Sequence, residues 1–245
     1  SLTLKSKLSP VKQPELQLVA KSLVINDQTT VQKNGAVTSS ASLKNNDMEI
    51  EDIHFYGKNP AARELLIKNI LYLGFDEDTQ NIKAGINEGK SAKAGSYTYV
   101  MKAYVRLNET EVVEVKEQTL TIKVVDGKKS PAKATVSAKG SINLLDRAGT
   151  EIVYTPKFTN MSATVVGVEL EGNGATCFET QVFDGLIYLR ACDGAALSTK
   201  NTYKLTMKFT LDNGYEGLTA VVNVKPTIKY PKKITATMTK GTLYK

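Results

Sequence analysis

The segment YTYVMK at residues 97–102 recurs as YKLTMK at residues 203–208, and this recurrence decides the fold class. Two more pairs of segments match at a similar distance. PAKATVSAKG (131–140) resembles PKKITATMTKG (231–241), and LTLK (2–5) resembles LTIK (120–123). A repeat distance of about a hundred residues is the size of a domain rather than of a solenoid repeat. The sequence therefore predicts tandem modules.

The matches also predict where the modules begin and end. We expect residues 1–10 to be the tail strand and linker of a preceding repeat. Residues 11–126 and 131–226 would be two modules, and 227–245 would start a following repeat. A chain that opens with Ser-Leu-Thr and no Met is interpreted as an excised fragment, so the lack of a signal peptide says nothing about its location.

Both modules are predicted to be β-sandwiches. Tyr97, Tyr99 and Met101 alternate with more polar residues, which is the period of a half-buried strand. The fold class is mainly β, with two tandem immunoglobulin-like sandwiches, although the Cys…Trp…Cys pattern of antibody domains is missing. Strands are expected near 14–25, 29–43, 47–56, 96–107, 110–116 and 118–126, then 132–138, 151–158, 164–170, 176–183, 186–192, 202–211 and 216–225.

The first module carries one predicted helix. Asn59 is a favourable N-cap, Pro60 suits the first helical position, and residues 61–73 are mostly good helix formers. Gly74 would take the left-handed position after the helix. The following stretch to Lys93 is polar and contains glycines, which predicts irregular structure. The second module has no obvious equivalent of this 57–93 insertion.

An insertion on one copy of a repeat is a place where binding specificity is often added. Arg63, Lys68, Tyr72 and Phe75 are therefore predicted to present a helix face to a partner. The alternative stays open that the helix only covers a sheet or bridges two strands.

The chain contains two cysteines, Cys177 and Cys192. Asp184-Gly185 between them is a strong hairpin turn signal. Counting outward from that turn places Phe183 opposite Leu186 and Cys177 opposite Cys192. Cross-strand neighbours lie near disulfide range, so a structural disulfide is favoured over two unrelated thiols, and a disulfide indicates an oxidising, extracellular setting.

The charge pattern argues against nucleic acid. The net charge is +7, but the lysines are scattered over strands and arginine is scarce. Nucleic-acid readers depend on arginine for bidentate contacts, whereas lysine on strand faces keeps sheets from aggregating. No apolar run approaches the ~18 residues of a membrane-spanning helix.

The sequence also argues against catalysis and metal binding. His54 is the single histidine, and we interpret it as a strand-end or loop residue rather than a catalytic one. The acidic clusters at 47–52 and 76–78 lack the EF-hand pattern and are interpreted as solvated. We expect no catalytic residues, no metal, no cofactor and no small-molecule substrate.

Three segments carry a resemblance to a known class: KGSINLLDRAG (139–149), YTPKF (154–158) and KNTYKLTMK (200–208). They resemble the tandem immunoglobulin-like or cadherin-like repeats of Gram-positive cell-surface proteins. Leu145-Asp146-Arg147 is similar to a cadherin calcium signature, but Ala148 replaces its ligating Glu, so calcium is not expected. In repeat style the chain is similar to the immunoglobulin-binding B-cell superantigens of gut commensals.

The resemblance implies a function class and no binding residues. It implies an extracellular, non-enzymatic binding fragment, on the bacterial surface or secreted, that engages host immunoglobulin variable regions. Attachment to the cell wall would use parts outside this fragment. Two alternatives stay open: passive stalk modules and a glycan-binding adhesin.

Overall fold

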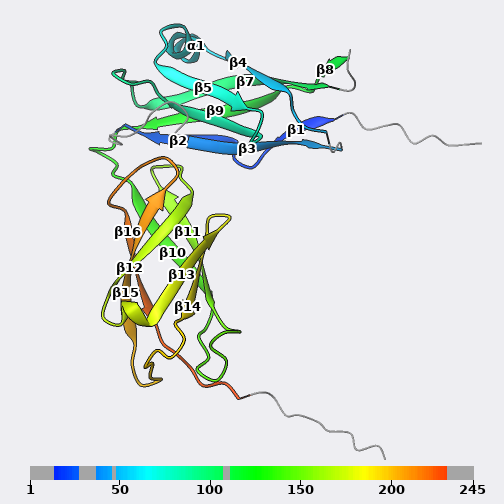
Figure 1. Cartoon of the computed structure of the whole chain (residues 1–245). Helices are drawn as coiled ribbons and strands as arrows, with labels where there is room; N and C mark the ends of the chain where they lie inside the picture. The colour runs from blue at the N-terminus through cyan, green and yellow to red at the C-terminus, as the bar shows by residue number, and fades with distance from the viewer. Residues whose placement is uncertain (1–13, 28–36, 46–47, 107–110, 231–245) are drawn as a thin grey trace, which may run out of the picture. The chain divides into compact units, whose positions relative to one another are not determined.

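The computed structural model describes residues 14–27, 37–45, 48–106 and 111–230. Within them the chain is mainly β, and its sheets form two sandwich modules that carry one α-helix (Figure 1). Contacts divide the chain into two compact units. No helix of the described part is long and apolar enough to cross a membrane.

The first module contains two sheets in which most neighbouring strands are antiparallel. One sheet has the order β1-β3-β6-β5, and the other β2-β9-β7-β4, with β8 also paired to β7. Their bounds are Glu15–Leu18 (β1), Ser22–Asn26 (β2), Val37–Lys44 (β3), Asp52–Gly57 (β4), Leu71–Asp76 (β5), Asn81–Ile86 (β6), Gly95–Arg106 (β7), Val112–Glu114 (β8) and Gln118–Val125 (β9). This arrangement extends the ABED and CFG sheets of the immunoglobulin fold by β2, which runs parallel to β9.

The first strand is split where the chain passes from one sheet to the other. β1 pairs with β3, and β2 pairs with β9 after a break at residues 19–21. At the break the buried Ser39 hydroxyl accepts from the Ala20 backbone N–H at 3.0 Å and donates to the Ala20 carbonyl at 3.0 Å. One side chain thus replaces ladder bonds that the break removes.

The predicted alternation in β7 is confirmed. Tyr97, Tyr99, Met101 and Val105 are buried, and they pack with the facing strands into one core. The repeat that first indicated the fold has a structural counterpart, because residues 203–208 lie in β15, which is central in its sheet as β7 is in its own.

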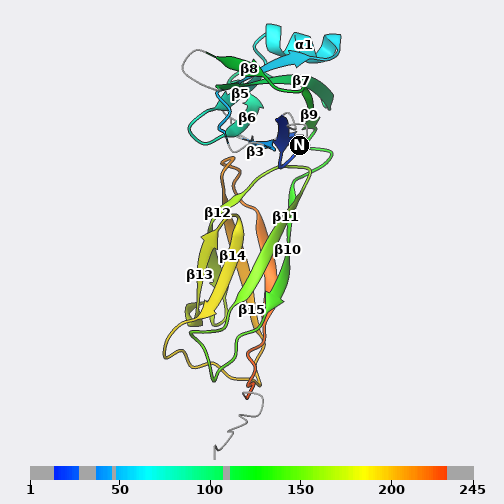
Figure 2. The same cartoon turned by 90° about the vertical axis from the view of Figure 1, so that its right-hand side faces the viewer.

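The helix begins as predicted and ends earlier. α1 spans Pro60–Ile67, and the Asn59 side chain accepts from the Ala62 backbone N–H at 2.8 Å. Lys68 is the C-cap and Asn69 takes the left-handed conformation (φ 51°). The predicted end near Leu73, with Gly74 after it, is therefore wrong. α1 contacts β4, β5 and β7 (Figure 2).

The prediction of irregular structure after the helix is also wrong. Residues 71–76 and 81–86 form the antiparallel pair β5–β6, and β6 pairs onward with β3. Pairing with β3, which is distant in sequence, overrides local helix propensity here. The insertion is thus mainly the short helix between β4 and β5, since β5 and β6 are regular strands of the sandwich.

The second module has seven strands, as predicted. Its sheets have the orders β10-β11-β14-β13 and β12-β15-β16, which is the constant-type immunoglobulin arrangement. The strands are Lys133–Gly140 (β10), Ile152–Thr159 (β11), Val165–Gly172 (β12), Phe178–Phe183 (β13), Leu186–Ala191 (β14), Tyr203–Leu211 (β15) and Thr219–Val224 (β16).

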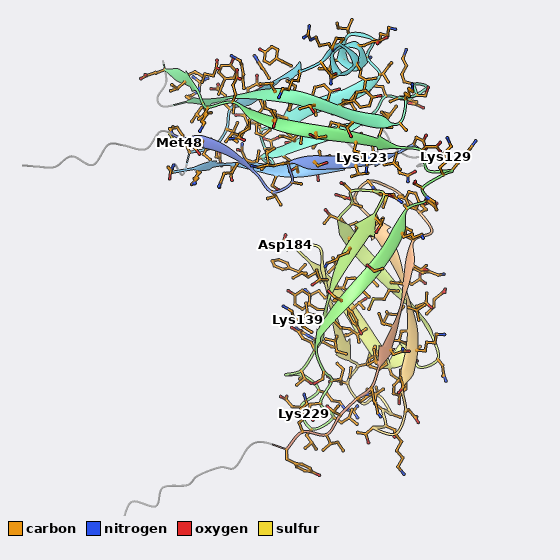
Figure 3. The ribbon with its side chains drawn as sticks, turned by 180° about the vertical axis from the view of Figure 1, so that it is seen from behind. Met48, Lys123, Lys129, Lys139, Asp184 and Lys229 are labelled. Atoms are coloured by element: carbon orange, nitrogen blue, oxygen red, sulfur yellow. The ribbon has the colours of Figure 1, made fainter. Side chains whose placement is uncertain are left out.

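The predicted hairpin register is confirmed. Asp184, labelled in Figure 3, and Gly185 both have positive φ, as a two-residue hairpin turn of type I′ requires. Phe183 pairs with Leu186, and the ladder continues to Phe178 opposite Ala191.

The predicted disulfide is absent, because both Cys177 and Cys192 are free cysteines. The Cys192 N–H does donate to the Cys177 carbonyl at 2.9 Å, so the backbones are paired where the count placed them. However, Cys177 ends the 3₁₀ turn Ala175–Cys177. The disulfide prediction assumed that side chains alternate regularly along the strand as far as Cys177. Because Cys177 lies in this turn and β13 begins only at Phe178, the alternation does not reach Cys177.

Several predictions fall outside the described residues. These are the tail at 1–10, the first part (29–36) of the strand expected near 29–43, and the following repeat apart from residues 227–230.

Candidate functional site

The four residues predicted to form one helix face lie on different elements. Arg63 is exposed on α1, and Lys68, its C-cap residue, pairs with Glu64. Tyr72 and Phe75 belong to β5, where Phe75 packs against the core. The structure therefore does not bring these residues together on one helix face.

A different set of side chains gathers on the outer face of β4, β7 and β8. The register places Asp52 opposite Tyr104 and Tyr104 opposite Glu114. His54 faces Lys102, and Arg106 faces Val112. Because side chains two residues apart share a face of a sheet, these residues project from one surface, which we call the β4–β7 face.

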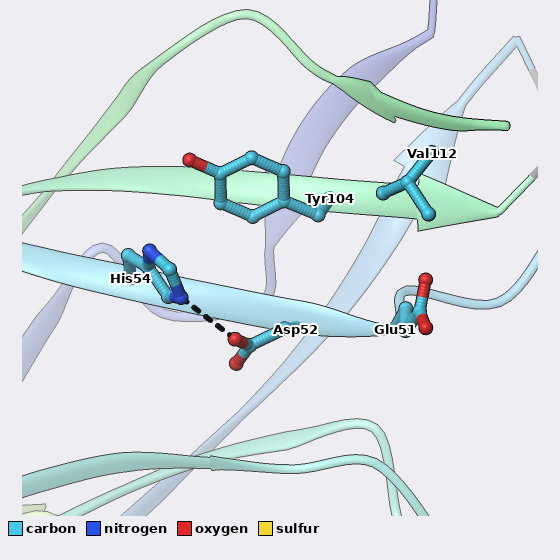
Figure 4. Close-up of a pocket in the computed structure, with 5 residues that line it drawn as sticks. All are labelled: Glu51, Asp52, His54, Tyr104 and Val112. Atoms are coloured by element: carbon cyan, nitrogen blue, oxygen red, sulfur yellow. Dashed lines mark ion pairs between the residues drawn. The ribbon is translucent and has the colours of Figure 1, made fainter.

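A shallow pocket of about 260 Å³ lies on the β4–β7 face. Five residues line it: Glu51, Asp52, His54, Tyr104 and Val112. Asp52 and His54 lie on β4, Tyr104 on β7 and Val112 on β8, and Glu51 comes directly before β4 (Figure 4). His54 Nε2 lies 2.8 Å from Asp52 Oδ2. The His54 ring packs against the Tyr104 ring with centroids 4.9 Å apart and a 58° tilt.

The two carboxylate oxygens of Glu51 differ in their hydrogen bonding. One of its carboxylate oxygens, Oε1, accepts from Arg106. The other, Oε2, is buried and has no hydrogen-bond partner within the described structure. A buried acceptor without a donor costs about 1–3 kcal/mol of folding stability.

The neighbouring charges are mostly paired. Lys102 Nζ lies 2.9 Å from Glu114 and 3.3 Å from Glu117, and these hydrogen bonds raise the pKa of Lys102. Burial raises the pKa of Tyr104, and the negative charge of Glu114 adds to the effect. Tyr104 therefore remains a neutral phenol, a hydrogen-bonding ring rather than an anion.

The lining residues supply two carboxylates, an imidazole, a phenol ring and an aliphatic side chain. The His54–Asp52 pair resembles two thirds of a hydrolase triad, but none of the five lining residues is a serine, threonine or cysteine that could act as the nucleophile. No group of three or more potential metal ligands occurs within the described residues. The pocket offers carboxylate acceptors beside an aromatic ring.

Sequence reasoning missed this site. It interpreted His54 as a strand-end or loop residue and Asp52 as part of a solvated acidic cluster, and it gave Tyr104 no role in a site. The usable signal was the alternation of Asp52, His54 and Tyr56 along one strand and of Lys102, Tyr104 and Arg106 along another. Only the pairing of these strands places the two sets side by side.

Neither a scan against protein-family models nor a search of curated proteins returns a match to this sequence.

Proposed function

We propose that the chain is a non-enzymatic binding fragment of a bacterial cell-surface protein, whose first module engages the variable region of host immunoglobulin through the β4–β7 face. The observation that carries the proposal is the open β4–β7 face, where Tyr56 and Val112 are 47% and 46% exposed beside the Tyr104–His54 contact.

The composition of this face supports a protein partner. Tyrosine and arginine are enriched in protein interfaces, and tyrosine supplies a large contact area for little loss of side-chain entropy. Exposed apolar side chains gathered near a pocket are a common mark of an interaction site. The variable domain as the specific partner, and the bacterial cell surface or secretion as the location, rest on the repeat style of the sequence.

The test is capture of antibody fragments. The whole chain is immobilised and exposed to Fab from polyclonal human immunoglobulin, and retention is measured. The double variant Tyr56→Ser/Val112→Ser should weaken retention by about thirtyfold, which corresponds to the ~2 kcal/mol of an interface hot spot.

A matched control lies on the other module. Phe183 and Val166 are 69% and 56% exposed there, so Phe183→Ser/Val166→Ser removes similar apolar surface away from the proposed face. This control should bind Fab like the parent chain. Equal loss in both variants would contradict the assignment to the β4–β7 face, and no Fab retention by the parent chain would favour the stalk interpretation.

Other routes remain distinguishable in the same assay. The double variant Arg63→Ala/Lys68→Ala tests the helix. Loss of Fab retention in that variant alone would assign the binding site to α1 instead of the β4–β7 face. Retention that free sugars compete away would favour a glycan-binding adhesin.

A further inference from the structure

Two Asn-Gly pairs lie in turns of the second module, and their surroundings differ. Asn173-Gly174 connects β12 to the 3₁₀ turn Ala175–Cys177, and Asn213-Gly214 lies in the turn after β15. An asparagine before a glycine can lose its side-chain amide without an enzyme, because glycine has no Cβ that would keep its backbone nitrogen away from the asparagine side chain. This reaction needs an asparagine side chain that can rotate and a glycine N–H that is free of hydrogen bonds.

The Asn213-Gly214 pair is held in a way that opposes this reaction. Asn213 is only 2% exposed. Its Nδ2 donates to the Ser162 carbonyl at 3.0 Å, and its Oδ1 accepts from the Tyr215 backbone N–H at 3.0 Å. The Gly214 N–H donates to the Leu211 carbonyl at 3.0 Å. These three hydrogen bonds must break before the side chain of Asn213 and the nitrogen of Gly214 can react with each other.

The Asn173-Gly174 pair is open to the reaction. Asn173 is exposed. Within the described residues, neither the Asn173 side chain nor the Gly174 N–H makes a hydrogen bond. We propose that Asn173 is a modification site of the second module, where deamidation converts the asparagine to a mixture of aspartate and isoaspartate. This proposal is independent of the proposed binding function.

The reaction needs water as its only co-reactant. The backbone nitrogen of Gly174 attacks the side-chain carbon Cγ of Asn173 and forms a C–N bond. The side-chain nitrogen leaves as ammonia, together with the proton that the Gly174 nitrogen gives up, and a cyclic succinimide remains. Water then adds to either carbonyl carbon of the succinimide and opens the ring to aspartate or to isoaspartate. In isoaspartate the backbone runs through the side-chain methylene, so the chain between Gly172 and Gly174 becomes one carbon longer.

The isoaspartate product should disturb the turn, because the glycines on both sides of Asn173 are closely packed. A Cβ on Gly172 would lie 2.6 Å from the Lys204 carbonyl oxygen, and a Cβ on Gly174 would lie 2.6 Å from the Tyr203 ring. The Tyr203 ring also packs edge-on against Phe178, with centroids 5.5 Å apart. A longer backbone in this turn therefore displaces the Tyr203 ring at the start of β15, whereas aspartate adds only a charge.

Peptide mapping by mass spectrometry, after incubation of the whole chain in mildly alkaline buffer, tests the assignment. Fragmentation of each peptide assigns the mass increase to one asparagine and distinguishes isoaspartate from aspartate. In the folded chain Asn173 should convert at least about tenfold faster than Asn213, because three hydrogen bonds oppose the reaction at Asn213. In urea the two should convert at similar rates. A third pair, Asn34-Gly35, lies outside the described residues, and its tryptic peptide is a separate one.

Two variants complete the test. Asn173→Gln removes the Asn-Gly pair at an exposed position, so it should melt like the parent chain and show no mass increase at position 173. Asn173→Asp supplies the aspartate product, and after equal incubation it should melt above the isoaspartate-containing parent chain. Equal melting of these two would contradict the disturbance of the turn by isoaspartate. In the folded chain, conversion of Asn213 as fast as Asn173, or no conversion of Asn173 while the chain in urea converts, overturns the proposal.

Discussion

Gly57 meets the backbone of Arg63 so closely that a Cβ on Gly57 would lie 2.4 Å from the Arg63 nitrogen. The Gly57 carbonyl also accepts a hydrogen bond from Arg63 Nε at 3.1 Å. The end of β4 and the first turn of α1 are therefore packed backbone to backbone. Since β4 carries Asp52 and His54, this contact anchors the strand that positions the candidate site.

Gly57→Ala should consequently destabilise the first module. The added methyl group collides with backbone atoms of Ala62 and Arg63, which cannot turn away as a side chain can. Overpacking of this kind costs about 1–3 kcal/mol, measurable by chemical denaturation. Gly95→Ala is the control, because its Cβ would make only ordinary contacts with Tyr97, at 3.7 Å or more. Equal stability of the two variants would show that α1 shifts freely.

A second anchor of the helix is the Tyr99 hydroxyl, which is buried and donates to the Ala62 carbonyl at 3.2 Å. Burial raises the pKa of Tyr99, so at neutral pH the phenol is protonated and can donate this bond. Tyr99→Phe should lower the free energy of unfolding by about 0.5–1.5 kcal/mol. Tyr56→Phe, at an exposed position, should change it by less than about 0.5 kcal/mol. Equal effects of the two would mean that the hydroxyl bond to the helix contributes nothing.

Local signals in the sequence predicted the features that depend on few residues. The Asn59 cap and the Asp184-Gly185 hairpin were both predicted correctly, because each is set by a cap or turn residue and its neighbours. β5 and β6 could not be recognised in this way. Leu71 and Leu73 favour a helix equally well, and in β6 the consecutive residues Ala84, Gly85 and Ile86 are all buried, so polar and apolar residues do not alternate there.

The candidate site was hidden for a related reason. Asp52 and Tyr104 are far apart in sequence and become neighbours only through the β4–β7 register. Each strand alone shows ordinary alternation of solvent-facing polar residues, which is expected of any half-exposed sheet. The pocket arises from which two strands pair and in which register, and composition and spacing do not contain that information.

The cysteines give a prediction about reactivity. Burial raises the pKa of Cys192, and the charge of Glu179 adds to this, so the reactive thiolate form is scarce at neutral pH. In the variant Cys177→Ser, alkylation of native Cys192 should be slower than that of a cysteine in a short peptide at the same pH, as rates by mass spectrometry would show. Unreduced, denatured parent protein should take up two alkyl groups. Uptake of none would mean that the cysteines form a disulfide in solution.

The last prediction concerns Asp76, at the end of β5. Its carboxylate pairs with Lys83, and its Oδ1 accepts from the Thr79 backbone N–H at 3.1 Å. The bond with Lys83, and then the bond with Thr79, hold the pKa of Asp76 below its ordinary value of 3.8. A carboxylate whose pKa is lower in the folded than in the unfolded state stabilises the fold above the unfolded pKa, and this contribution is lost as pH falls through the folded pKa.

Asp76→Asn should therefore melt at a lower temperature than the parent chain at pH 7, and the difference should shrink as pH falls below 4. Lys83→Met removes the partner, so in that variant the effect of Asp76→Asn should be much smaller and should keep only the part that comes from the Thr79 bond. Thermal unfolding of the four proteins in this double-mutant cycle, from pH 7 down to pH 2, measures the coupling. A difference between the parent and Asp76→Asn that stays constant over this range would mean that the charge of Asp76 plays no part.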